Sequence, residues 1–466
     1  MRAHFVGMDD RRRALQAAHA AALGFLDGLD ERPVWPRADI DDMLRVFGDP
    51  LPDDGEDAAA VVTDLAERAD PGLVAIPGGR FFGFVIGGTL PAALAADWLV
   101  SAWDQNSGSS TMTTATVALE RVAGRWVCDL MGLPEDAAVG WVTGAQVSNF
   151  VCLAVAQHAV LRRAGWDLTR QGLRGAPPLR FVVGRHRHAS VDRAARFAWI
   201  GADELVVVET DGEGRMLPAA LAEVLAAGAD TPTVVCLQAG EVHTGAFDPF
   251  DELIPLARAA GAWIHVDGAF GLWAAATPGL RHLVAGAAGA DSWTSDAHKT
   301  LNVPYDCGMA IIRDPADAIA MFRTGGDYLM YTSLDPWDVN PELSRRGRGV
   351  PAWAALKSLG RRGVADLVDR LHANARRLEA GLRRIDGVTV VNDVVYTQVM
   401  FRLGDDEATR ALGAAILADG TAALTGAEWD GRATLRCSMS SWATTDEDID
   451  LTLGAIRRLV GEIRVA

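Results

Sequence analysis

Two lysines stand out because this chain otherwise takes its positive charge from arginine. Of the 44 basic residues, only Lys299 and Lys357 are lysines. A lysine amine can form an imine with an aldehyde, whereas a guanidinium stays protonated. Lys299 ends the run Ser295-Asp296-Ala297-His298-Lys299, which follows a strand-like segment. We predict that Lys299 is a reactive amine at a strand end. We interpret Lys357 as a lysine that remains by chance in a chain that otherwise uses arginine. The alternative for Lys299 is an exposed lysine beside a structural histidine.

An aspartate ends a second strand-like run, at Asp267. A buried carboxylate is costly unless a cation pairs with it, and a protonated pyridine nitrogen is such a cation. Ala269 is small enough to lie under a flat ring. Asp267 could instead cap the following turn. It could also join His265, on the same strand face, in a metal site. We find no convincing third ligand and expect no metal.

Two further segments could bind parts of the same aromatic group. The segment Val142–Asn149 contains a glycine turn that enters a predicted helix, and such a turn offers free backbone N–H groups to an anion. His188 follows another strand-like run and could stack on a ring or bind a carboxylate. Its alternative is simple packing near a helix start. His298, beside Lys299, could donate a hydrogen bond to a phosphate or to a substrate carboxylate.

These residues must be positioned by a fold, and the sequence pattern of residues 140–312 indicates which one. Short apolar runs alternate with Ala/Leu-rich stretches, which predicts a mainly parallel sheet covered by helices on both faces. Ligands of such sheets lie at the carboxyl ends of the strands. The expected strands are Phe181–Gly184, Leu205–Glu209, Val234–Leu237, Trp263–Asp267, Ser292–Ser295 and Gly308–Ile312, and the expected helices are 147–164, 190–199, 216–227 and 250–260.

The flanking regions predict smaller units. Residues 1–70 contain two helical stretches, at 9–30 and 57–69, and suggest an N-terminal helical arm. We expect a large domain over 71–350, with a long functional loop at 324–349. Residues 351–466 predict a long helix and then a small α+β domain. Its expected strands are 387–392, 395–403 and 433–439, and its expected helices are 405–418 and 445–461.

Composition excludes some partners. The chain has 466 residues and a formal net charge of −17, so nucleic acid and anionic membranes are not expected partners. The most apolar stretch, 81–100, is interrupted by glycines, Pro91 and Asp97, and we do not expect a membrane span. The start of the chain lacks the apolar core of a signal peptide. Five scattered cysteines do not suggest a disulfide framework, and a cytoplasmic location is expected.

The order of these segments resembles the pyridoxal-dependent (group II) amino acid decarboxylases, over roughly residues 70–450. That family has the fold type I, aspartate aminotransferase-like architecture: a large, mainly parallel seven-stranded sheet domain, an N-terminal arm and a small C-terminal α+β domain. The matching segments are Arg80–Phe84, His188–Arg196, His265–Gly271, Ser295–Gly308 and Leu343–Arg348 followed by Trp353–Lys357. The resemblance implies a homodimer with pyridoxal 5′-phosphate (PLP) as cofactor and an amino acid as substrate.

The resemblance also implies roles for individual residues. Lys299 would carry the cofactor as a Schiff base, and Asp267 would bind the pyridine nitrogen. His188 would stack on the ring and orient the substrate carboxylate, with Ala269 on the other face. The phosphate would be held by Gly144, Ala145, Gln146 and His298. Phe82 and Phe84 would help to shape the partner's pocket.

Other positions depart from the family pattern or leave alternatives open. Ala145 or Val147 stands where relatives often have serine, and Thr300 where they usually have tryptophan. Glu241 and His243 lie where relatives place neutral polar residues. Family members donate a proton from a loop tyrosine, for which Tyr331 is the candidate, with Tyr328 more suited to packing and Trp337 near the same position. Arg345, Arg346 and Arg348 could bind an acidic substrate group or form a solvated turn; of these we select Arg345 as a substrate residue.

Three functions follow. The first is decarboxylation of an L-amino acid to the amine and carbon dioxide. The second is another PLP-dependent lyase reaction on the same scaffold, such as carbon–carbon cleavage. Aldehyde formation belongs to this second reading and becomes possible if no tyrosine delivers the proton. The third is a non-enzymatic binding protein, against which the presence of both Lys299 and Asp267 argues.

Overall fold

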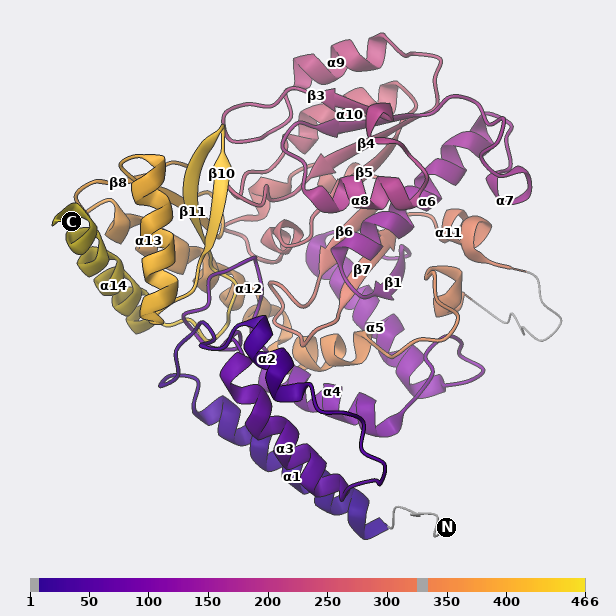
Figure 1. The fold of residues 1–466 in the computed structure, drawn as a ribbon. Coiled ribbons are helices and arrows are strands. Elements are labelled where there is room, and N and C mark those ends of the chain that lie inside the picture. Colours follow the sequence, from indigo (N-terminus) through magenta and orange to yellow (C-terminus); the bar gives the residue numbers. More distant parts are fainter. Residues whose placement is uncertain (1–7, 325–333, 466) are drawn as a thin grey trace.

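A seven-stranded sheet forms the centre of the computed structural model, which describes residues 8–324 and 334–465 (Figure 1). Its strand order is β1-β7-β6-β5-β4-β2-β3. Strands β3, β2, β4, β5 and β6 are parallel, and β7 runs antiparallel to both of its neighbours. The strands are β1 (Ala138–Val142), β2 (Arg180–Gly184), β3 (Leu205–Val208), β4 (Thr233–Gln238), β5 (Trp263–Asp267), β6 (Ser292–Asp296) and β7 (Gly308–Ile312).

Both faces of this sheet are covered, which explains its nearly continuous apolar strands. Along β4, Val234 and Cys236 face a core shared with α6 and α8. Val235 and Leu237 face the opposite core, which includes side chains of α5, α9, α10 and α12. The helices of this region are α4 (Pro91–Trp103), α5 (Thr114–Met131), α6 (Ala145–Arg163), α7 (Leu168–Gln171), α8 (Ala189–Phe197), α9 (Pro218–Ala226), α10 (Phe250–Ala259) and α11 (Pro315–Phe322).

A second, antiparallel sheet lies beside the first, in the order β10-β11-β9-β8. The helix α12 (Gly349–Leu382) connects the two regions and is kinked at Gly360, where φ is +64°. Its first half packs in the core of the large sheet and its second half in the core of the small one. The remaining elements are β8 (Val388–Val390), β9 (Gln398–Leu403), β10 (Thr425–Trp429), β11 (Arg432–Ser438), α13 (Asp406–Asp419) and α14 (Asp446–Val465).

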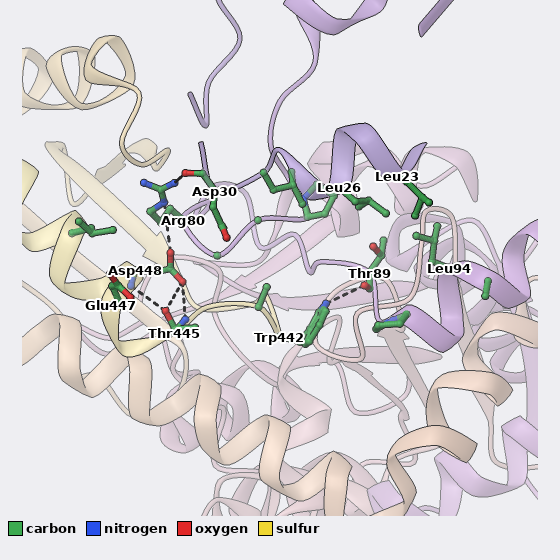
Figure 2. Close-up of a pocket in the computed structure, with 18 of the residues that line it drawn as sticks. Leu23, Leu26, Asp30, Arg80, Thr89, Leu94, Trp442, Thr445, Glu447 and Asp448 are labelled. Carbon is green, nitrogen blue, oxygen red and sulfur yellow. Dashed lines mark hydrogen bonds and ion pairs between the residues drawn. The ribbon is translucent and has the colours of Figure 1, made fainter. Parts of the chain in front are cut away.

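The N-terminal helices pack mainly on one another, away from the large sheet (Figure 1). They are α1 (Met8–Asp27), α2 (Ile40–Phe47) and α3 (Ala58–Ala69). Together with α4 they expose many large apolar side chains, among them Leu15, Leu23, Ile40, Leu44, Val61, Leu65, Trp98 and Trp103. A cavity of about 860 Å³ lies between α1, α4 and the start of α14, where Figure 2 shows Leu23, Leu26 and Leu94. None of the residues that carry the predicted chemistry lines it.

The fold class predicted from the sequence is confirmed. The alternating segments of residues 140–312 are the observed strands and helices, with bounds that shift by at most a few residues. The sequence pattern missed the strands β1 and β10. It also gave no account of the helices α2, α4, α5, α7 and α11. The division of the chain at residues 70 and 350 stays a prediction. No helix among residues 8–324 and 334–465 is long and apolar enough to cross a membrane.

Phe82 does not have the role expected from the resemblance. Its side chain is 1% exposed and belongs to the core of the C-terminal sheet. The backbone explains this placement, because Phe82 N donates to Ala423 O and Ser438 N donates to Phe82 O. The segment therefore lies alongside the small sheet. Phe84, two residues later, is 58% exposed and keeps its place among the candidate pocket residues.

Candidate active site

The predicted residues meet where several strands end. Asp267 and Asp296 are the last residues of the neighbouring strands β5 and β6, and Gln238 is the last residue of β4 beside them. Residue Gly308, which begins the antiparallel β7, pairs with both Val142 and Asp296. The turn after β1 therefore reaches the same edge of the sheet. This is the position at which ligands bind parallel sheets.

Lys299 and His298 share one buried carboxylate. Lys299 Nζ lies 3.0 Å and His298 Nε2 lies 3.4 Å from Asp296 Oδ2. Burial acts to raise the pKa of Asp296, but the charges of His298 and Lys299 outweigh it and hold that pKa below its usual value. The other oxygen, Asp296 Oδ1, is buried and has no hydrogen-bond partner in the described part of the chain. Asp296 therefore lies against both side chains.

The glycine turn before α6 packs closely against the start of β7 and against His298. A Cβ on Gly308 would lie 2.4 Å from Gly144 Cα, and a Cβ on Gly144 would lie 3.1 Å from His298 Cε1. No side chain caps the start of α6, so its first N–H groups are available. Cys307 N donates to His298 Nδ1 at 3.2 Å, which leaves the proton of a neutral ring on Nε2. Backbone N–H groups of Ala145 and Gln146 and the ring of His298 can thus bind a phosphate.

A hydrogen-bonded chain fixes the carboxylate of Asp267. Asn149 Nδ2 donates to Asp267 Oδ2 at 2.9 Å, and Asn149 Oδ1 lies 2.9 Å from His265 Nε2. Since the amide nitrogen of Asn149 is a donor here, its oxygen accepts, and His265 Nε2 carries the proton. His265 Nδ1 then accepts from Ser292 Oγ at 2.9 Å. Burial lowers the pKa of His265 to about 4, so its ring is neutral at pH 7.

This network involves the residues of the alternative metal site, His265 and Asp267. Both ring nitrogens of His265 are engaged with Asn149 and Ser292. Among residues 8–324 and 334–465, no three His, Cys, Asp or Glu side chains gather in a way that could hold a metal ion. Asn149 is a site residue that the sequence argument missed. It lies one turn into the helix that begins at the glycine turn, and that spacing was the available signal.

His188 begins α8 near this carboxylate. Its Nδ1 lies 2.8 Å from Ser190 Oγ, and its backbone N donates to Gln238 Oε1 at 3.2 Å. Desolvation lowers the pKa of the His188 imidazole, with Asp267 acting in the opposite direction. Ala269 N donates to Asp267 Oδ1 at 3.2 Å, and Ala269 O accepts from Asp296 N at 2.9 Å. Ala269 thus ties the two acidic strand ends together.

Arg345 does not reach this site. Its guanidinium is buried and donates to Glu120 Oε2 at 2.7 Å, Glu120 Oε1 at 2.9 Å and two backbone carbonyls. Its expected role in substrate binding is therefore wrong for this chain. Arg346 pairs with Asp97 at 2.5 Å and Arg348 with Asp306 at 2.7 Å. Trp337 is 7% exposed. Tyr328 and Tyr331 lie outside the described residues.

Arg436 is the cationic residue that the sequence argument missed. It lies on β11, 4% exposed, and its Nη1 donates to Val242 O at 2.9 Å. Its Nε is buried and has no hydrogen-bond partner within the described ranges. Arg436 contributes to the lowered pKa of His188, which places its charge within electrostatic reach of the site. Arg436 could be recognised as a site residue only from the fold, which brings β11 next to the large sheet.

Comparison with known proteins agrees with this arrangement. Residues 41–404 match the model of the pyridoxal-dependent decarboxylase conserved domain. The chain belongs to the pyridoxal-dependent decarboxylase family. Its cofactor is pyridoxal phosphate, and the uncapped start of α6 beside Gly144 and the oriented carboxylate of Asp267 fit that group. Phosphate would lie at Gly144–Gln146 and His298, and the pyridine nitrogen at Asp267.

Individual relatives of this decarboxylase-family chain differ in their reactions. The acidic amino acid decarboxylase GADL1 of Mus musculus is 28% identical over 333 residues, which cover 69% of this chain and 60% of the mouse protein. The 4-hydroxyphenylacetaldehyde synthase of Rhodiola rosea is 25% identical over 446 residues, covering 91% and 89%. The crystal structure of Oryza sativa TDC with PLP and tryptamine superposes with a TM-score of 0.92 at 23% identity, covering 98% and 99%.

Proposed function

We propose that this enzyme is an amino acid decarboxylase, which converts an L-amino acid to the corresponding amine and carbon dioxide. The observation that carries the proposal is that Asp267 ends β5, that Lys299 and His188 follow β6 and β2 at the same edge of the sheet, and that the uncapped start of α6 lies beside them. An amine, a buried carboxylate and a ring-stacking imidazole in one site are the groups that PLP-dependent chemistry on an amino acid requires.

Each residue would have a distinct task. Pyridoxal phosphate, when bound, supplies the electron sink that accepts the electron pair left at Cα. Lys299 would bind the cofactor through Nζ and then yield its place to the substrate amine. Asp267, fixed by Asn149, would hold a proton at the pyridine nitrogen. His188 would pack on one ring face and Ala269 on the other, which keeps the ring rigid.

The α-carboxylate of the substrate must be bound and oriented before it is lost as carbon dioxide. Arg436 is suited to this task because it is buried, directed by Val242 O and has an unsatisfied Nε. His188 lies within its electrostatic reach, so the two would orient the substrate carboxylate together. Protonation at Cα completes the reaction. We keep Tyr331 as the candidate donor, and Phe84 as a residue of the substrate pocket.

Aldehyde formation is the second candidate: after loss of carbon dioxide, dioxygen would take two electrons and become hydrogen peroxide, and water would release ammonia and leave the aldehyde. It is favoured by the match along 91% of the chain to a 4-hydroxyphenylacetaldehyde synthase. The two reactions share Lys299, Asp267 and His188, and differ in the fate of Cα after carbon dioxide has left. The nature of the organic product therefore separates them.

We further propose that the enzyme is a homodimer and acts in the cytoplasm. The exposed apolar side chains on α1 to α4, and the cavity that α1 and α4 line, provide a surface that a second copy could cover. Size-exclusion chromatography with light scattering tests the assembly. A monomer at micromolar concentration would contradict it.

The activity test is a screen of L-amino acids with the PLP-loaded protein. Released carbon dioxide and the organic product would both be measured for each amino acid. Carbon dioxide with an equal amount of amine supports decarboxylation. Carbon dioxide with an aldehyde, ammonia and peroxide supports the second candidate. Retro-aldol products without carbon dioxide would reject both and favour the carbon–carbon lyase alternative.

A further inference from the structure

The turn between β4 and α10 contains a buried acid that the proposed reaction does not use. Glu241 is 2% exposed. Its Oε2 accepts hydrogen bonds from the backbone N of His243 and of Thr244, both at 2.6 Å. Two backbone bonds close the same turn, from Gly245 N to Glu241 O and from Glu241 N to Ala246 O. The Glu241 side chain therefore fixes the path of residues 241–245.

This turn carries the acceptor that directs Arg436. Val242 O, in the middle of the turn, accepts from Arg436 Nη1 at 2.9 Å. Glu241 and Arg436 also attract one another electrostatically: the carboxylate acts to raise the pKa of Arg436, against a larger lowering by burial. Glu241 thus holds Arg436 in two ways, through the backbone of the turn and through its charge.

His186, His188 and His243 lie around the wall that Arg436 and the turn 241–245 form. Burial lowers the pKa of His243 to about 4, with Arg436 adding to the effect. Desolvation likewise lowers the pKa of His188. His186 and His243 both pack on Trp429, with ring centroids 4.5 and 5.7 Å away. At about pH 8 the charged groups of this wall therefore include Arg436 and Glu241.

We infer that Glu241 is a specificity-determining residue, which positions Arg436 and offsets its charge. This wall would therefore bind the one carboxylate that every amino acid carries and would disfavour amino acids with an acidic side chain. The inference rests on the proposed binding of an amino acid at this site. A substrate with two anionic groups would place its second charge near an ionised Glu241. A substrate with a neutral side chain would meet the same Arg436 without that repulsion.

The inference carries a pH dependence of known sign. Burial raises the pKa of Glu241 to about 7, although its hydrogen bonds and Arg436 act in the opposite direction. Glu241 is therefore mostly charged at about pH 8 and mostly neutral at about pH 6. Arg436 from β11 and His243 from the same turn act on Glu241. His186 and Glu213 lie nearby, because Gly214 packs between the Glu241 and His186 side chains. Binding of a dianion should strengthen as the pH falls through about 7.

The test compares two anions that stay ionised throughout this range, ethanesulfonate and ethanedisulfonate. Their dissociation constants would be measured by calorimetry on the PLP-loaded wild type, on Glu241→Gln and on the control Glu213→Gln. Glutamine can still accept from both N–H groups of the turn. At about pH 8, Glu241→Gln should tighten the disulfonate about tenfold relative to the monosulfonate, and Glu213→Gln should leave that ratio unchanged.

The wild type provides a readout that needs no variant. Its preference for the monosulfonate should fall about tenfold between about pH 8 and pH 6, and Glu241→Gln should show no such step. An unchanged ratio in both experiments would overturn the role of Glu241. Uptake of PLP, measured by visible absorption on the same samples, is independent of that outcome. Failure to take up PLP would instead reject the proposed function.

Discussion

Lys299 Nζ lies 3.0 Å from the carboxylate of Asp296, three residues earlier in the chain. The same oxygen of Asp296 lies 3.4 Å from His298 Nε2. One buried acid therefore holds the amine that would bind the cofactor aldehyde and the ring that would bind its phosphate.

Asp296→Asn should weaken the fold with a defined pH dependence. The folded-state pKa of Asp296 lies below its ordinary value, so its stabilisation is present above about pH 4 and is lost as the pH falls through the folded-state pKa. We expect the PLP-free variant to lose about 2 kcal/mol at neutral pH, with the two proteins converging in acid. Urea unfolding across this range measures the difference. Asp317→Asn is the control, because burial raises the pKa of Asp317 and its pH trend has the opposite sign.

Asp267→Asn should abolish most of the turnover while leaving the fold intact. Asparagine is nearly the same size but cannot hold a proton on the pyridine nitrogen as a carboxylate does. Asn149→Ala, which removes the neighbour that orients Asp267, should lower kcat less, by about 10–100-fold. Steady-state kinetics on the best amino acid substrate checks the order. A larger loss for Asn149→Ala than for Asp267→Asn would contradict the roles assigned.

Gly308→Ala should impair cofactor binding. Its Cβ would lie 2.4 Å from Gly144 Cα, so the phosphate turn would have to move. We expect PLP affinity to fall by about tenfold or more, at a cost in stability of about 1–3 kcal/mol. Equilibrium titration of PLP by absorbance is the measurement. Gly212→Ala, where no atom lies within 4 Å of the added Cβ, should bind PLP normally.

Arg345→Ala should destabilise the protein. Removing the guanidinium leaves Glu120 buried without its partner, which costs about 3–5 kcal/mol in comparable cases. The chemical-denaturation midpoint should drop, and the KM of correctly folded enzyme should stay near the wild-type value. A normal midpoint together with a strongly raised KM would restore Arg345 as a substrate residue.

How far the sequence predicts this molecule depends on the range of the contacts involved. Strands such as β5 and β7 are buried on both faces, so their apolar runs mark them directly. Asp267 and Lys299 could be recognised because each comes at or just after such a run. A carboxylate such as Asp267 is costly to bury, and lysine is rare in this chain. Their chemistry is local to a strand end, and the sheet topology brings the ends together.

Residues defined by distant partners could not be placed in this way. Arg345 stands in a basic turn, but its partner Glu120 is 225 positions away. Phe82 lies in an aromatic segment that becomes one strip of the small domain's core. Arg436 and Asn149 become site residues only when β11 and α6 meet the large sheet. Composition and sequence spacing do not predict these long-range tertiary contacts.

The central claim is that Lys299 carries the cofactor, and reduction with borohydride tests it most directly. Wild-type protein incubated with PLP would be recorded by visible absorption, reduced, digested and mapped by mass spectrometry, alongside Lys299→Ala. We predict a yellow wild type that borohydride bleaches, with the label fixed on the peptide containing Lys299 and absent from the variant. A label on Lys357, or a protein that stays colourless with PLP, would contradict the account.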